Sequence, residues 1–155
     1  VPPDYQLRYR QWMNRYEVRS KIHQIRQTRG RKVLNSPQGT HYDLDEVFDQ
    51  LNRDYFGGKL EKPTLGWSKT VSRTRLGHFE PSHHVIVISR ILDLADAPRI
   101  LLDYVMYHEI LHIIHPVELD GNRRRIHTKD FRTAERKFPE FQKIQKLLRE
   151  YIRSK

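Results

Sequence analysis

The chain has 155 residues, of which 31% are charged and 37% are hydrophobic, a composition that is ordinary for one globular domain. It contains no cysteine, which excludes disulfide bridges and thiolate metal ligands. It also has no apolar run of about 18 residues, which excludes a transmembrane helix. We therefore expect a cytoplasmic protein without a membrane partner, and the sequence carries no signal for its oligomeric state.

The net charge of +10 is concentrated in the first part of the chain. Residues 1–35 contain nine Lys or Arg and two acids, whereas residues 36–155 contain twenty and seventeen. A concentrated cationic segment attracts polyanions, and nucleic acid is the usual one. The sequence therefore predicts a basic N-terminal arm over residues 1–35 and a compact domain over residues 43–155.

The arm is predicted to be helical over residues 4–29, where aromatic residues recur at helical spacing. Its cationic side chains are the candidates for contact with nucleic acid, with DNA as the expected partner: Arg15, Arg19, Lys21, Arg26, Arg29, Arg31 and Lys32. Three alternatives to nucleic-acid binding stay open for the arm. In the first it packs on the domain as a solvated amphipathic helix, in the second it covers and inhibits a functional groove, and in the third it lies on a membrane surface.

The next helix is predicted from Asp43 to about Phe56, after a loop. Asp43 and Glu46 resemble a capping box, and Gly57 follows as a stop. The apolar positions of this segment share one helix face, which we expect to point to a core: Leu44, Val47, Phe48, Leu51 and Tyr55.

Three short strands are predicted over residues 64–70, 75–80 and 84–89, because the pattern changes there to short apolar runs separated by turn residues. The third strand contains four consecutive β-branched residues, Val85–Ile88. Such a run is typical of a strand that is buried on both faces.

A further helix is predicted to begin near Pro98, and its apolar residues surround almost the whole axis. We expect this helix in the middle of the core. It should end at or before His115, because the residue ahead of Pro116 avoids the α conformation. Two more helices are predicted over residues 128–137 and 139–152.

Residues His108, Glu109 and His112 form the pattern HExxH within this buried helix. Two histidines four residues apart share one helix face and can reach the same ion, and the glutamate beside the first can reach a water at that ion. A buried helix tolerates three such polar groups only if their polarity is satisfied, and a metal satisfies all three. The pattern therefore predicts a metal site.

A catalytic zinc usually takes three protein ligands, so a third ligand is needed. His115 lies on the same face but about 10 Å from His108 along the axis, at a rise of about 1.5 Å per residue, which is too far for one ion. His127, at the predicted start of the next helix, is the better candidate. Three acidic residues stay open as alternative ligands: Glu118, Asp120 and Glu135. We expect one Zn²⁺ per chain.

The chain resembles the SprT-like zinc metalloproteases from about residue 43 to residue 140. The resemblance lies in an ordered set of motifs: LNRDYFGGKL, LGWS, RLGHFEPSHHVIVIS, YHEILH and IHTKDFRTAERKFP. It implies a small gluzincin-like α+β domain, with a three-stranded sheet packed on helices that include a buried HExxH helix. It also implies that His108, His112 and His127 bind the metal and that Glu109 is the general base.

Two features depart from the family pattern. Thr128 stands where the family often has Gly, and these 155 residues contain no cysteine that could form the zinc ribbon of many members. The basic arm lies outside the resemblance. The best-known eukaryotic members cleave proteins crosslinked to DNA. That choice of substrate depends partly on regions outside the metal site, so the resemblance implies it only weakly.

The resulting hypothesis is a zinc-dependent metallopeptidase that acts on a protein or peptide substrate, including proteins associated with DNA. Zinc would activate a water, and Glu109 would take its proton. Five side chains are candidates by type to stabilise the oxyanion: His78, His83, His84, Tyr104 and Tyr107. The strand before the metal helix is expected to bind substrate as an added strand. The rival hypothesis is a nucleic-acid-binding module that uses the arm, with a metal site that is structural or inactive.

Overall fold

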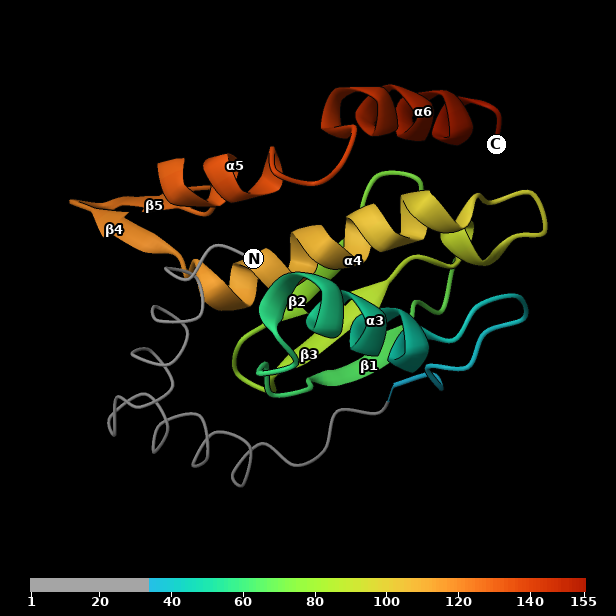
Figure 1. Ribbon diagram of the computed structural model, residues 1–155, viewed down its shortest axis with the longest axis horizontal. Coiled ribbons are helices and arrows are strands. Elements are labelled where there is room, and N and C mark those ends of the chain that lie inside the picture. The colour runs from blue at the N-terminus through green and yellow to red at the C-terminus, as the bar shows by residue number, and fades with distance from the viewer. Residues whose placement is uncertain (1–33) are drawn as a thin grey trace.

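Figure 1 shows a computed structural model of the chain, which describes residues 34–155. The helix predicted over residues 4–29 and the seven cationic candidates in the arm lie outside the described residues. Within the described part the protein has the predicted α+β architecture, with four α-helices and a three-stranded sheet. None of the helices described there combines the length and the apolar character that a bilayer crossing requires.

Helix α3 (Leu44–Phe56) begins and ends as its sequence predicts. The side chain of Asp43 caps the N-terminus by accepting a hydrogen bond from a backbone N–H of the first turn. Gly57 ends the helix with a φ of 64°, a left-handed conformation that glycine adopts without steric strain. The predicted core face differs at one position, because Phe56 is buried whereas Tyr55 is only partly buried.

The sheet consists of β1 (Thr64–Trp67), β2 (Gly77–Glu80) and β3 (Val85–Ile88), each shorter than predicted. The strand order is β1-β3-β2, with β3 parallel to β1 and antiparallel to β2. All four residues of β3 are buried, as its β-branched run predicts. The expectation that the strand before the metal helix accepts an added strand is wrong, because β3 is central and hydrogen-bonded on both sides.

Helix α4 (Arg99–Ile114) forms the centre of the core and contacts α3, β2 and β3. Eleven of its sixteen residues are buried, so nearly its whole circumference is covered. It ends at Ile114 with His115 as its C-cap, as the position of Pro116 predicts. A 3₁₀ helix, η1 (Arg90–Asp93), precedes it and was not predicted.

The segment after α4 forms a hairpin of β4 (Glu118–Asp120) and β5 (Arg123–Arg125), which turns at Gly121 with a φ of 62°. The hairpin was not predicted, because such short polar strands have no alternating apolar pattern. The two predicted C-terminal helices follow as α5 (Lys129–Glu135) and α6 (Phe141–Arg153), and both contact α4. Figure 1 shows α5 over one half of α4 and α6 over the other.

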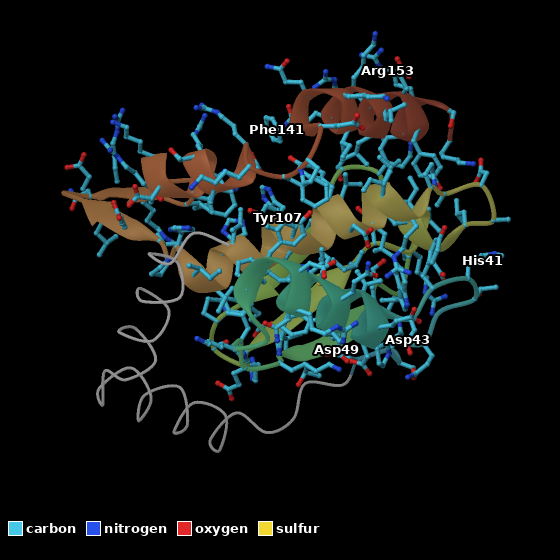
Figure 2. The ribbon with its side chains drawn as sticks, viewed as in Figure 1. His41, Asp43, Asp49, Tyr107, Phe141 and Arg153 are labelled. Carbon is cyan, nitrogen blue, oxygen red and sulfur yellow. The ribbon has the colours of Figure 1, made fainter. Side chains whose placement is uncertain are left out.

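Aromatic contacts hold α5 against α4. Tyr107, labelled in Figure 2, is buried in α4 and donates a hydrogen bond of 2.8 Å to the carbonyl of Ala134 in α5. The ring of Phe138 lies 5.1 Å from that of Tyr107 and 5.5 Å from that of Tyr104, measured between centroids. These contacts hold the C-terminal end of α5 and the residues just after it against α4.

Candidate metal centre

Three histidines from two helical regions meet at one point. His108 and His112 lie one turn apart on α4, with ring centroids separated by 5.1 Å. His127 immediately precedes Thr128, the N-cap of α5, and its ring lies 5.2 Å from that of His108 and 5.0 Å from that of His112. Each histidine offers a ring nitrogen, and these nitrogens all lie within 4.8 Å of one another. The arrangement forms a group that could hold a metal ion.

Within residues 34–155, this is the one cluster of three His, Asp or Glu side chains with such geometry. The four alternative ligands lie outside it: His115, Glu118, Asp120 and Glu135. His115 is buried, with an exposed fraction of 3%, at the end of α4. Glu118 and Asp120 are exposed on β4. The structure therefore brings together the three predicted ligands, and none of the four alternatives is part of the group, although Glu135 contacts His108.

Glu135, at the end of α5, contacts the group through the His108 ring. Its Oε2 accepts a hydrogen bond from Nδ1 of His108, which leaves Nε2 of that ring available to a metal. Burial by itself would raise the pKa of the Glu135 carboxyl, but the hydrogen bond and charge of His108 outweigh burial and hold this pKa below its ordinary value. Glu135 is thus a positioning residue. Sequence reasoning considered it only as a ligand, because an acid in the following helix does not reveal its partner.

A series of hydrogen bonds connects Glu135 to α6. The side chain of Tyr104 hydrogen-bonds to Glu135, and Nε2 of Gln145 in α6 donates to the Tyr104 hydroxyl at 3.4 Å. Burial raises the pKa of Tyr104 to about 12, so the phenol keeps its proton at neutral pH. Tyr104 therefore supports His108 through Glu135 and belongs to the packing behind the metal group.

Phe131 forms an apolar floor under the three histidines. Its side chain is fully buried in the first turn of α5. Its ring centroid lies 5.0 Å from that of His108, 4.6 Å from that of His112 and 4.9 Å from that of His127. Close packing on this side restricts rotation of the imidazoles and keeps water away from their inner faces. The sequence alone assigned Phe131 no role, although an apolar residue four positions after His127 was visible.

The protonation of the histidines suits metal binding. Burial lowers the pKa of His112 to about 3, and the neighbouring charges of His108 and His127 act in the same direction. Burial likewise lowers the pKa of His127. At neutral pH these rings are therefore neutral and offer a lone pair. Three imidazoles on one side of a cavity are a donor set that fits Zn²⁺ with one position left for a water or substrate.

Glu109 lies buried beside the group, with an exposed fraction of 4%. Burial raises the pKa of its carboxyl to about 7, although the charges of His108 and Arg75 oppose the shift. Its Oε2 atom is buried and has no hydrogen-bond partner within the described residues. Buried carboxylate oxygens are usually paired, and a water at an ion held by the histidines would supply the missing partner.

Gly77 allows β2 to approach Glu109 closely. A Cβ atom added at Gly77 would lie 3.1 Å from Cγ of Glu109, 3.2 Å from Ile88 and 3.3 Å from Val105. A side chain at this position would therefore press on Glu109 with no free space on either flank. The glycine of the sequence motif RLGHFE thus determines how tightly the sheet covers the HExxH turn.

A cleft of about 670 Å³ opens over the metal group and Glu109. One wall comes from the segment around β2 and the other from the segment after α4. The remaining lining residues are Arg75, Gly77, His78, Phe79, Pro81, Pro116, Val117, Arg124 and Ile126. An extended peptide could reach the three histidines through this opening.

Of the five candidates for stabilising an oxyanion, only His78 lines this cleft. His83 pairs with Glu80 in the turn between β2 and β3, at 2.5 Å. His84 is buried with its ring edge-on to Phe79. The hydroxyls of the two tyrosines point to α5 and its supporting contacts, as described above. The sequence could name donors by type, but only the packing showed which one faces the cleft.

The supporting role of Glu135 leads to a test of metal affinity. We expect Glu135→Gln to weaken zinc binding about 10- to 100-fold, because the amide retains the shape of the side chain but loses the charge that orients His108. Titration of metal-free protein with Zn²⁺ against a competing chelator measures this. Glu150→Gln, the same change at an exposed position of α6, is the control. Equal affinities of the two variants would contradict the role of Glu135.

Comparison with known proteins agrees with the geometry at the level of the family. Neither the curated proteins nor the solved structures contain a significant match to this chain. A family model described as the SprT-like family matches residues 44–149. The match extends from the start of α3 into α6 and includes the HExxH helix, the hairpin and α5. The chain belongs to the SprT-like family.

Proposed function

We propose that this protein is a zinc-dependent metallopeptidase that hydrolyses peptide bonds. The observation that carries the proposal is the meeting of three histidine nitrogens within 4.8 Å of one another, in a cleft that also contains the buried carboxylate of Glu109. Membership of the SprT-like family supports a metallopeptidase-like role. The proposed ligands of one zinc per chain are His108, His112 and His127.

The side chains of the cleft have distinct proposed roles. When bound by the three histidines, Zn²⁺ would polarise the scissile carbonyl and lower the pKa of the attacking water towards about 7. Glu109 would accept the proton of that water and donate it to the leaving amine. His78, on the β2 wall, would donate a hydrogen bond to the developing oxyanion. Glu135 would hold the His108 ring in place throughout.

Removal of the metal tests this proposal. We expect the purified full chain to degrade an unfolded protein such as casein, to lose that activity on treatment with 1,10-phenanthroline, and to regain it with Zn²⁺ but not Mg²⁺. Three imidazoles favour zinc, whereas Mg²⁺ prefers oxygen ligands. Fragments resolved by gel electrophoresis measure the activity. Undiminished degradation by the metal-free chain would contradict a metallopeptidase.

A DNA-associated substrate is a further part of the proposal. Its support is the charge of the arm, residues 1–35, which contain nine Lys or Arg and two acids. The rival function, a nucleic-acid-binding module with a structural metal site, depends on the same residues. Both stay predictions from the sequence, because the seven cationic candidates lie outside the described residues.

A further inference from the structure

Two arginines from opposite walls line the cleft over the metal group. Arg75 precedes β2 and Arg124 lies in β5, on the wall formed after α4. Both side chains are exposed, and neither guanidinium has an ion-pair or hydrogen-bond partner within residues 34–155. Arg75 is also near enough to Glu109 for its charge to lower the pKa of that carboxyl. The cleft therefore contains two cationic donors that the fold itself does not use.

The hairpin presents one particular arginine to the cleft. Arg123, Arg124 and Arg125 are consecutive strand residues, so their side chains alternate between the two faces of the hairpin. Arg125 pairs across the hairpin with Asp120 at 2.8 Å, and Arg123 is not part of the cleft lining. Arg124 points the other way and lines the cleft. Arg123, which has the same charge and lies outside the cleft lining, provides the matched control.

Negative charge is scarce around this opening. Glu109 is the one carboxylate among the lining residues, and it is buried. Residues 118–155, which include the hairpin, carry a net charge of +6, whereas residues 34–117 carry −3. A bound dication would increase the positive potential. A cleft whose walls carry charge of one sign attracts ligands of the opposite charge and raises their local concentration.

Resting on the proposed function, we infer that Arg75 and Arg124 make the cleft selective for peptide segments with an Asp or Glu side chain close to the scissile bond. A guanidinium forms two parallel hydrogen bonds with a carboxylate, a geometry that an uncharged amide does not reproduce. The cleft also exposes apolar surface from Phe79, Val117 and Ile126. A peptide uses both kinds of surface, whereas a phosphate backbone uses only the arginines.

The probes are fluorescence-quenched peptide pools of random sequence with one fixed position that holds Glu, Gln or Lys. Pools that differ in the place of the fixed residue show which substrate position each arginine contacts. For the zinc-loaded full chain we expect kcat/KM for the best Glu pool to exceed that of the Gln pool by up to about fivefold per exposed pair, and the Lys pool to be poorest. Raising the salt to about 1 M should reduce the ratio, because exposed charges are screened.

Three substitutions test which arginine produces the preference for the Glu pool over the Gln pool. Arg124→Gln and Arg75→Gln are each expected to abolish the Glu/Gln ratio at one fixed position, and Arg124→Glu should invert it in favour of Lys. Arg123→Gln makes the same change in net charge on the same strand and should preserve the ratio. Binding of labelled pools to zinc-loaded Glu109→Gln, followed by fluorescence anisotropy, reports selectivity without any hydrolysis.

Each outcome is decisive. Equal kcat/KM for the three pools, or a ratio that falls equally in Arg123→Gln, would overturn the inference while leaving the peptidase function intact. Charge-selective binding without hydrolysis of any pool would support the selectivity and contradict the peptidase function. Displacement of the Glu pool by oligo-dT at lower concentration than by an acidic peptide, with a dependence on Arg124, would assign the cleft to phosphate instead and overturn the inference.

Discussion

Replacing Glu109 with Gln is expected to lower kcat about 10²- to 10⁴-fold while the chain still binds one zinc. The amide fills the same volume but cannot take a proton from the attacking water. Because Glu109 is outside the group of histidines, the substitution leaves the three ring nitrogens in place. Casein hydrolysis and metal content by mass spectrometry, measured on the same preparation, check both halves of the expectation.

A structural explanation must be separated from a chemical one in this experiment. Glu109 is buried and packs against Gly77, so a distorting variant could lose activity through the fold. Gly77→Ala, which adds a methyl group 3.1 Å from Cγ of Glu109, is the comparison. We expect it to lower both thermal stability and activity, whereas Glu109→Gln should lower activity alone. Full hydrolysis by Glu109→Gln would remove this residue as the general base.

Replacing His127 with Ala is expected to abolish zinc binding at stoichiometric concentrations. Two imidazoles on one helix turn remain, but a catalytic zinc site requires three protein ligands. His127 is exposed, so the variant leaves no buried cavity and should fold. Zinc that binds only the folded state raises the melting temperature, and that rise should disappear in His127→Ala. Mass spectrometry of the purified protein and thermal melts with and without Zn²⁺ measure the two effects.

His115→Ala is the matched control, and the opposite pattern is expected for it. Its side chain is buried against Phe131, with ring centroids 6.3 Å apart, so its removal should lower the melting temperature. Zinc content should stay at one per chain, because His115 is not part of the metal group. Loss of zinc in His115→Ala but not in His127→Ala would mean that the third ligand is misassigned.

Local sequence determined the elements that carry the site. The cap at Asp43, the left-handed stop at Gly57 and the proline after His115 each act within a few residues, so the ends of two helices followed directly from them. The spacing of His108 and His112 likewise places both on one face of a helix, whatever surrounds it. Local rules of this kind need no knowledge of the rest of the chain.

Strand lengths and pairings required the tertiary structure. The β-branched residues of β3 predicted a buried strand, but not that β1 would pair with it in parallel and β2 antiparallel. That pairing makes β3 central and excludes it as the strand that accepts a substrate. The β4–β5 hairpin was missed for the same reason, since exposed three-residue strands form through a turn and cross-strand contacts rather than through an apolar pattern.

By itself, the sequence predicted the family motifs, the candidate metal ligands and the candidate general base, because these predictions depend on residue type and spacing. Only the tertiary structure decided the surroundings of the ligands. It placed Glu135 behind His108, Phe131 beneath all three rings, and Arg124 rather than Arg123 in the cleft. Those roles depend on which side chains from distant segments meet, and the position of each segment is set by packing around α4 rather than by its own residues.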